Sequence, residues 1–234
     1  MSSMIIFGGS GGIGLAIAKM ARRLNFEVII ADKTEPPNLR DIVFVPTDAT
    51  QEGDVKRVLI KATEKLGVID VVINCQGLYL VERVEKTGVQ SWDDLMNVNL
   101  KSVFLVCKNI IPIMKWQGRG YIVNIASMAG LRGKIGQSAY CASKFGVVGL
   151  TEAIHEELKG SGVRISAVCP SSVDTPFLND VVNLGKEELD KILQPEDIAR
   201  VIAELITSHK RVHRKIIPIE IELEIDKLEK KKEA

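Results

Sequence analysis

The 234-residue chain lacks the features that mark nucleic-acid-binding, membrane and secreted proteins. Lysine plus arginine (31) nearly balance aspartate plus glutamate (30), so no overall field attracts nucleic acid or an anionic membrane. Apolar runs such as residues 4–7 fall far short of the roughly 20 residues of a membrane helix, and no signal-type segment opens the chain. We therefore expect a cytoplasmic protein that acts on a small molecule, without nucleic-acid or membrane partners.

Potential metal ligands and disulfide partners are also scarce. The chain has four cysteines, without the paired spacing of a zinc site or of a secreted disulfide framework. The three histidines, His155, His209 and His213, share no metal-ligand spacing. We expect reduced cysteines and no metal site.

Short β-branched and apolar runs do occur, and they alternate with longer stretches of helical periodicity. The expected strands are residues 4–7, 27–31, 42–46, 70–74, 121–125, 164–169 and 216–225, and the expected helices are 12–24, 51–66, 92–116, 138–159 and 195–208. This alternation predicts a single α/β domain over residues 1–225, with a mostly parallel seven-stranded sheet and helices on both faces. Residues 226–234 form a charged tail.

A glycine-rich turn, GGSGGIG at residues 8–14, lies between the first expected strand and helix. Glycines there allow backbone N–H groups to approach a pyrophosphate at the helix N-terminus, although a structural loop can also collect glycines. Asp32 follows 18 positions after Gly14, where a carboxylate can accept hydrogen bonds from ribose hydroxyls and repel a 2′-phosphate. NAD(H) is favoured, with NADP(H) as the alternative because Lys33 partly offsets that repulsion.

Tyr140 and Lys144 are four residues apart at the start of an expected helix, which places them on one face. A nearby ammonium stabilises a phenolate, so we expect Lys144 to lower the pKa of Tyr140 from its usual value of about 10. The pair predicts proton transfer by Tyr140.

With this pair and its surroundings, the chain resembles the short-chain dehydrogenase/reductase family over residues 4–208. The 3-oxoacyl carrier-protein reductases are members of this family. The matching segments are the glycine turn, Asn74 to Gly77, Asn97 to Leu100, Ser127, Tyr140 with Lys144, and Pro170 to Thr175. The resemblance implies a Rossmann-type doubly wound fold and an NAD(P)-dependent oxidoreductase that interconverts a secondary alcohol and a ketone. Hydroxysteroids and sugars are further substrate classes of the family.

The resemblance also implies roles for individual residues. The implied catalytic residues are Asn99, which holds a water for a proton relay, Ser127, which bonds the substrate oxygen, Tyr140 and Lys144. The implied cofactor-binding residues are Gly8, Ser10, Gly12, Ile13, Gly14, Asp32, Asp48, Ala49, Asn74, Gly77, Tyr140, Lys144, Pro170, Val173 and Thr175. It further implies a substrate-covering segment at about residues 176–194, and a homodimer or homotetramer joined through the helices at 92–116 and 138–159.

Four positions depart from the family pattern. Phe7 stands in place of threonine, Cys75 and Gln76 in place of the second asparagine and the alanine of Asn-Asn-Ala-Gly, and Ser171 in place of glycine. These departures support an alternative function, a catalytically idle dinucleotide-binding sensor or scaffold. The complete set of four catalytic residues favours the enzyme.

Overall fold

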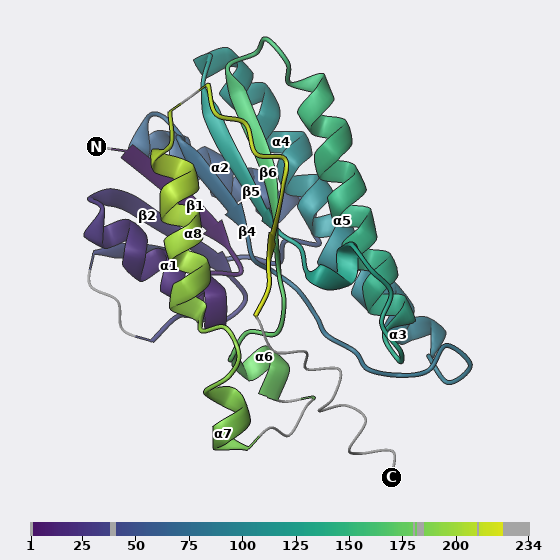
Figure 1. Ribbon diagram of the computed structural model, residues 1–234. Coiled ribbons are helices and arrows are strands. Elements are labelled where there is room, and N and C mark those ends of the chain that lie inside the picture. The colour runs from purple at the N-terminus through teal and green to yellow at the C-terminus, as the bar shows by residue number, and fades with distance from the viewer. Residues whose placement is uncertain (1, 38–40, 180, 182–184, 210, 222–234) are drawn as a thin grey trace.

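Strands β1 to β7 form one parallel sheet in the order β3-β2-β1-β4-β5-β6-β7 (Figure 1). The computed structural model describes residues 2–37, 41–179, 181, 185–209 and 211–221. Its strands are β1 (Ser2–Phe7), β2 (Phe26–Asp32), β3 (Ile42–Pro46), β4 (Val71–Asn74), β5 (Gly120–Ile125), β6 (Val163–Pro170) and β7 (Ile216–Ile219). The chain order reverses between β1 and β4, and in such sheets ligands bind beyond the carboxyl ends of the strands at that point.

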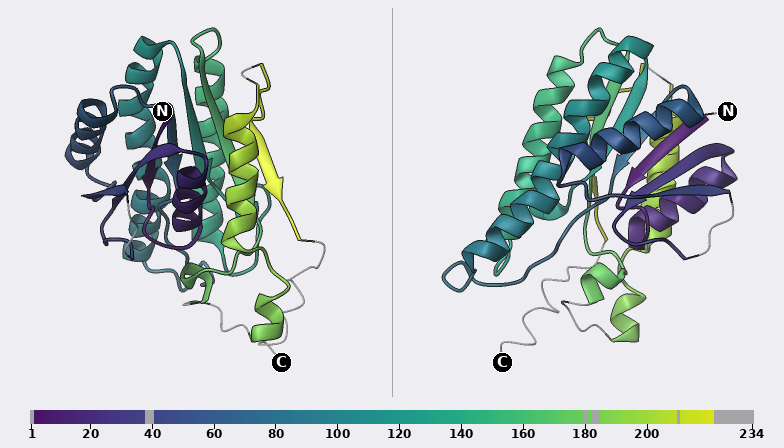
Figure 2. Two further views of the ribbon diagram at one scale, coloured as in Figure 1. Left: turned by 90° about the vertical axis from the view of Figure 1, so that its left-hand side faces the viewer. Right: turned by 180° about the vertical axis from the view of Figure 1, so that it is seen from behind.

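Helices cover both faces of this sheet (Figure 2). One layer contains α2 (Glu52–Leu66), α4 (Ser102–Gln117) and α5 (Ser138–Glu157), and the other contains α1 (Gly12–Arg23) packed beside α8 (Pro195–Thr207). The remaining short helices are α3 (Val89–Leu95), a π-helix (Met96–Lys101), a 3₁₀ turn (Met128–Gly130), α6 (Pro176–Asn179) and α7 (Lys186–Leu189). No helix in the described ranges is long and apolar enough to cross a membrane.

The sheet is held in place by burial of both its faces. On β1, Ile5 and Phe7 pack toward α2 and α4, whereas Met4 and Ile6 pack toward α1 and α8. Successive strand residues point to opposite faces, so a strand covered on both sides is apolar throughout. Each such side chain contributes about 1.5–3 kcal/mol by its burial, which makes the carboxyl edge of the sheet a rigid platform.

The expected single domain with a seven-stranded Rossmann-type sheet and helices on both faces is confirmed. Six strands and four helices match the expected ranges to within two residues at either end. The expected strand 216–225 is wrong at its end, because β7 stops at Ile219. Pro218 removes a ladder donor there and is tolerated because β7 lies at the sheet edge. Residues 222–225 and the expected tail at 226–234 lie outside the described residues.

The expected single α-helix at 92–116 is also wrong. The chain is helical from Val89 to Gln117, but a π-helical segment from Met96 to Lys101 separates α3 from α4. Single π-turns inside helices are frequently found at functional sites. This one contains Asn99.

Candidate active site

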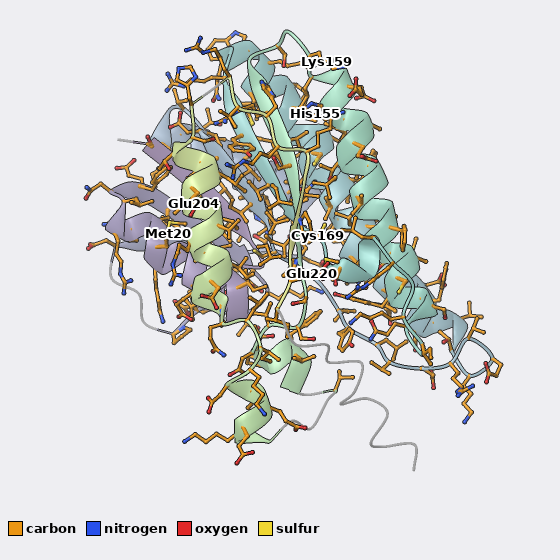
Figure 3. The ribbon with its side chains drawn as sticks, in the orientation of Figure 1. Met20, His155, Lys159, Cys169, Glu204 and Glu220 are labelled. Carbon is orange, nitrogen blue, oxygen red and sulfur yellow. The ribbon has the colours of Figure 1, made fainter. Side chains whose placement is uncertain are left out.

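A cavity of about 620 Å³ lies at the carboxyl edge of the sheet. Its walls include the residues that directly follow β1, β4 and β6, namely Gly8, Cys75 and Ser171. Cys169, labelled near the centre of Figure 3, marks the end of β6 from which the last of these segments leaves the sheet. The cavity therefore lies where the strand order reverses, the place expected for a dinucleotide.

The glycine turn has a backbone that side chains would disrupt. Gly8 and Gly12 have positive φ values of 73° and 48°. A Cβ on Gly8 would lie 2.5 Å from the backbone nitrogen of Gln76, and one on Gly14 would lie 2.2 Å from the carbonyl oxygen of Gly8. Gly11 caps α1 without a side-chain hydrogen bond, which leaves the first-turn N–H groups for an anion. The turn fits a pyrophosphate.

Asp32 is held in position at the end of β2 by backbone donors. Its carboxylate oxygens accept hydrogen bonds from the backbone N–H of Ser10 (3.0 Å) and of Lys33 (2.7 Å). The Lys33 ammonium turns away to Asp48, with 3.0 Å between Lys33 Nζ and Asp48 Oδ2. The cation beside Asp32 is therefore already paired with another carboxylate.

Tyr140 lies in the first turn of α5, where only 6% of its surface is exposed. Burial raises the pKa of its phenol above the usual value, and a hydrogen bond with Ser127 opposes that rise. Ser127 caps the 3₁₀ turn after β5, and its Oγ accepts the backbone N–H of Ala129 (3.1 Å). Both residues line the cavity, and the raised pKa keeps Tyr140 protonated at neutral pH.

Lys144 is buried one turn further along α5. Its Nζ donates to the backbone oxygen of Ile125 (3.1 Å) and lies 5.7 Å from the centre of the Tyr140 ring. Burial lowers the pKa of its ammonium to about 8. The expected lowering of the Tyr140 pKa is not seen in this structure, because burial of the phenol dominates and raises that pKa.

Asn99 supports the cavity from behind. Its side-chain Nδ2 donates to the Leu78 carbonyl oxygen (3.0 Å) and to Ser143 Oγ (2.9 Å), and its Oδ1 accepts the Leu78 N–H (2.6 Å). A Cβ built on Gly77 would lie 3.5 Å from Asn99 Oδ1 and 3.8 Å from Lys144 Nζ. These contacts fix the segment after β4 against the face of α5 that carries Lys144.

Most of the expected site residues come together in this one cavity. Its walls include Gly8, Gly12, Ile13, Gly14, Asp32, Asp48, Ala49, Gly77, Ser127, Tyr140, Lys144, Pro170, Val173 and Thr175. Three expected residues, Ser10, Asn74 and Asn99, are not part of the wall. Ser10 holds Asp32, while Asn74 Nδ2 donates to Asn124 Oδ1 (2.8 Å) inside the sheet.

The sequence interpretation missed an aromatic wall. The Tyr79 ring packs edge-on against Tyr140 (4.8 Å between ring centres) and is stacked with Phe177 of α6 (5.7 Å). Gln137, which is 3% exposed, donates from Nε2 to the Tyr79 hydroxyl (2.9 Å). Gln137 precedes Tyr140 by three residues and is the N-cap residue of α5. That spacing could have identified Gln137, whereas Tyr79 carried no such signal.

The chain resembles known oxidoreductases over most of its length. A family model described as short chain dehydrogenase matches residues 2–184. The D-beta-hydroxybutyrate dehydrogenase of Rhizobium meliloti (strain 1021) is 32% identical over 186 residues, 74% of this chain and 72% of that protein. The 3-oxoacyl-[acyl-carrier-protein] reductase of Thermotoga maritima is 32% identical over 215 residues, 85% of this chain and 87% of that protein. The crystal structure of levodione reductase has a TM-score of 0.85 and 26% identity, covering 94% of this chain and 96% of that one.

Proposed function

Because the chain belongs to the short-chain dehydrogenase/reductase family, we propose that Tyr140 transfers the proton when a ketone and a secondary alcohol are interconverted in this cavity. The protein is an NAD(P)-dependent oxidoreductase that acts on CH–OH groups of small molecules. The observation that carries the proposal is that Tyr140 and Ser127 line one cavity, with Lys144 Nζ 5.7 Å from the centre of the Tyr140 ring. Both hydroxyl groups can reach one substrate oxygen.

The chemistry divides among the four expected catalytic residues. In the reductive direction Tyr140 donates a proton to the substrate oxygen, and Ser127 hydrogen-bonds the same oxygen as it gains negative charge. When bound, the nicotinamide supplies the hydride. Lys144 has N–H groups beyond the one given to Ile125, and these would bind a ribose hydroxyl. Asn99 would position Lys144 and Gly77 and hold the water of a proton relay.

The remaining residues of the site support cofactor binding at two ends of the cavity. The glycine turn would hold the pyrophosphate, with Asp32, Asp48 and Ala49 at the adenosine end. Pro170, Val173 and Thr175 would hold the nicotinamide end. In the single domain of residues 1–225, the segment at about 176–194 would cover the substrate, since Phe177 and Leu178 line the cavity. Residues 180 and 182–184 of this segment lie outside the described residues. Transfer of label from deuterated NADH to a carbonyl compound tests this function, and binding without transfer would indicate the sensor or scaffold.

We also propose that the protein prefers NAD(H) over NADP(H). The Asp32 carboxylate is fixed by two backbone donors, so it can accept hydrogen bonds from ribose hydroxyls without reorganising. A 2′-phosphate at the same place would meet this carboxylate. The nearby ammonium of Lys33 would have to leave Asp48 to offset the repulsion.

Replacement of Asp32 by serine is expected to raise the dissociation constant of NADH roughly 10-fold, because a charge-assisted hydrogen bond to the ribose is lost. The same change should lower the dissociation constant of NADPH, since it removes the repelling charge. Titration by nicotinamide fluorescence measures both values. Asp41→Ser, which alters an exposed carboxylate at the opposite end of the sheet, is the control. An unchanged ratio of the two constants in Asp32→Ser would contradict the preference.

We propose a cytoplasmic homodimer or homotetramer. An apolar groove of about 490 Å³ runs between the start of α4 and α5, and its lining includes Leu100, Phe104 and Leu150. Phe104 of α4 and Phe145 of α5 are 45% and 46% exposed, so both helices present a large apolar side chain to solvent. Light scattering after gel filtration should give a mass of two or four chains for the wild type and of one chain for Phe104→Asp. A monomeric wild type would contradict this proposal.

A further inference from the structure

Two buried side-chain oxygens in the described part of the chain have no hydrogen-bond partner, Gln76 Oε1 and Ser171 Oγ. Buried polar atoms are nearly always hydrogen-bonded, so each such atom requires an explanation. Both residues line the cavity of the active site. Both also occupy positions where the chain departs from the family pattern, which has alanine and glycine there. These shared features indicate that one molecule bound in the cavity supplies the missing hydrogen-bond partner of both oxygens.

The orientation of the Gln76 amide is fixed by its neighbours. The Ser102 hydroxyl donates to the Val98 carbonyl oxygen (2.6 Å), so Ser102 Oγ can only accept from Gln76. The Gln76 Nε2 therefore faces Ser102 (3.0 Å), and Oε1 is left as a pure acceptor that needs a donor. Gln76 lies against Gly8, whose N–H donates to Ala31 beside Asp32. The backbone that carries this acceptor thus borders the glycine turn on the side of Asp32, and the adenosine half of a dinucleotide offers donors, the ribose hydroxyls and the adenine amino group.

Ser171 lies in the segment that follows β6 and lines the cavity. Its backbone N–H donates to the Ile219 carbonyl oxygen of β7 (2.8 Å), so the main chain at this residue is fixed. The hydroxyl lies at the start of the loop that carries Val173 and Thr175. The methyl group of Thr175 faces Gly12 of the glycine turn. A serine hydroxyl both donates and accepts, so it can pair with either atom of a carboxamide.

We propose that Gln76 and Ser171 are further cofactor-binding residues of this chain, Gln76 accepting from the adenosine half and Ser171 bonding the nicotinamide carboxamide. The inference rests on the proposed function, since it requires a dinucleotide in the cavity. From the sequence alone, Gln76 and Ser171 support a catalytically idle protein. With a dinucleotide in the cavity, their side chains instead make additional hydrogen bonds to the cofactor.

Binding of NADH and of ADP-ribose, which lacks nicotinamide, separates the two roles. Gln76→Ala should raise the dissociation constants of both ligands by roughly 3- to 10-fold, which is the effect of losing one hydrogen bond. Ser171→Ala should raise the dissociation constant of NADH by a similar factor and leave that of ADP-ribose unchanged. Calorimetric titration gives the dissociation constants. Gln117→Ala at the end of α4 and Ser161→Ala in the turn before β6, both away from the cavity, should change neither dissociation constant.

A thermal measurement excludes a general loss of structure. Without ligand, Ser171→Ala loses no hydrogen bond, so its Tm should equal or exceed that of the wild type. The rise in Tm on saturation with NADH should be smaller than in the wild type. A wild type that binds neither NADH nor NADPH overturns the proposed function and this inference with it. Wild-type binding with unchanged affinities in both variants overturns the inference alone.

Discussion

Replacement of Tyr140 by phenylalanine is expected to lower kcat by about 10²- to 10⁴-fold, the usual contribution of a positioned general acid. The change removes one hydroxyl and leaves the ring packed against Tyr79. The dissociation constant of NADH should therefore stay within about twofold of the wild-type value. Initial rates at 340 nm on any carbonyl compound that the wild type reduces, with NADH affinity measured in parallel, give both quantities.

Tyr121→Phe is the matched control for this variant. Tyr121 is also a buried tyrosine, and its hydroxyl bonds Ser166 Oγ (2.8 Å) on the side of the sheet away from the active site. Its loss should reduce stability by about 1 kcal/mol and leave kcat unchanged. Near-normal turnover by Tyr140→Phe would show that another group donates the proton.

Replacement of Lys144 by methionine is expected to remove most of the activity and, without cofactor, to make the fold more stable at pH 7. Burial holds the pKa of Lys144 at about 8 in the folded protein, against about 10.5 when unfolded. At pH 7 the folded protein must keep a buried charge, which corresponds to a penalty of order 3 kcal/mol. The lost hydrogen bond to Ile125 offsets part of the gain, by about 1 kcal/mol.

The pH dependence has a definite sign. Between pH 8 and 10.5 the unfolded chain binds more protons at this lysine than the folded one, so wild-type stability gains from rising pH. The gain in the free energy of unfolding that Lys144→Met brings should therefore be largest below pH 8 and disappear toward pH 10.5. Urea unfolding at pH 7 and pH 10 measures it. Lys159→Met, at the exposed far end of α5 in Figure 3, should show no such trend. An advantage that is equal at both pH values would contradict the buried charge.

The sequence predicted the parts of the structure that depend on local pattern. Runs such as residues 4–7 and 27–31 are apolar because both faces of the sheet are covered, and this pattern is visible without coordinates. The glycine turn and Asp32 were predictable for the same reason, since their roles depend on backbone conformation and position after a strand. The family resemblance then brought in distant residues such as Ser127.

The sequence could not predict features that depend on packing between distant segments. Tyr79 contacts Phe177 and Tyr140 only because the loop after β4 meets the helices α6 and α5. The pairing of Lys33 with Asp48 joins the segments that follow two strands, and it occupies the ammonium that was expected to offset the repulsion of a 2′-phosphate. The pKa of Tyr140 was misjudged because helical spacing indicates where a cation lies but not how deeply the phenol is buried.

Isotope transfer tests the central claim most directly. Wild-type protein would be incubated with NADH deuterated at both C4 positions and a panel of ketones, acyl thioesters and sugars, and the products analysed by mass spectrometry. The proposed function predicts an alcohol with one deuterium on the carbinol carbon and a hydroxyl proton from solvent. Binding of NADH without deuterium in any product of the panel would contradict it and indicate a protein that holds a dinucleotide without using it.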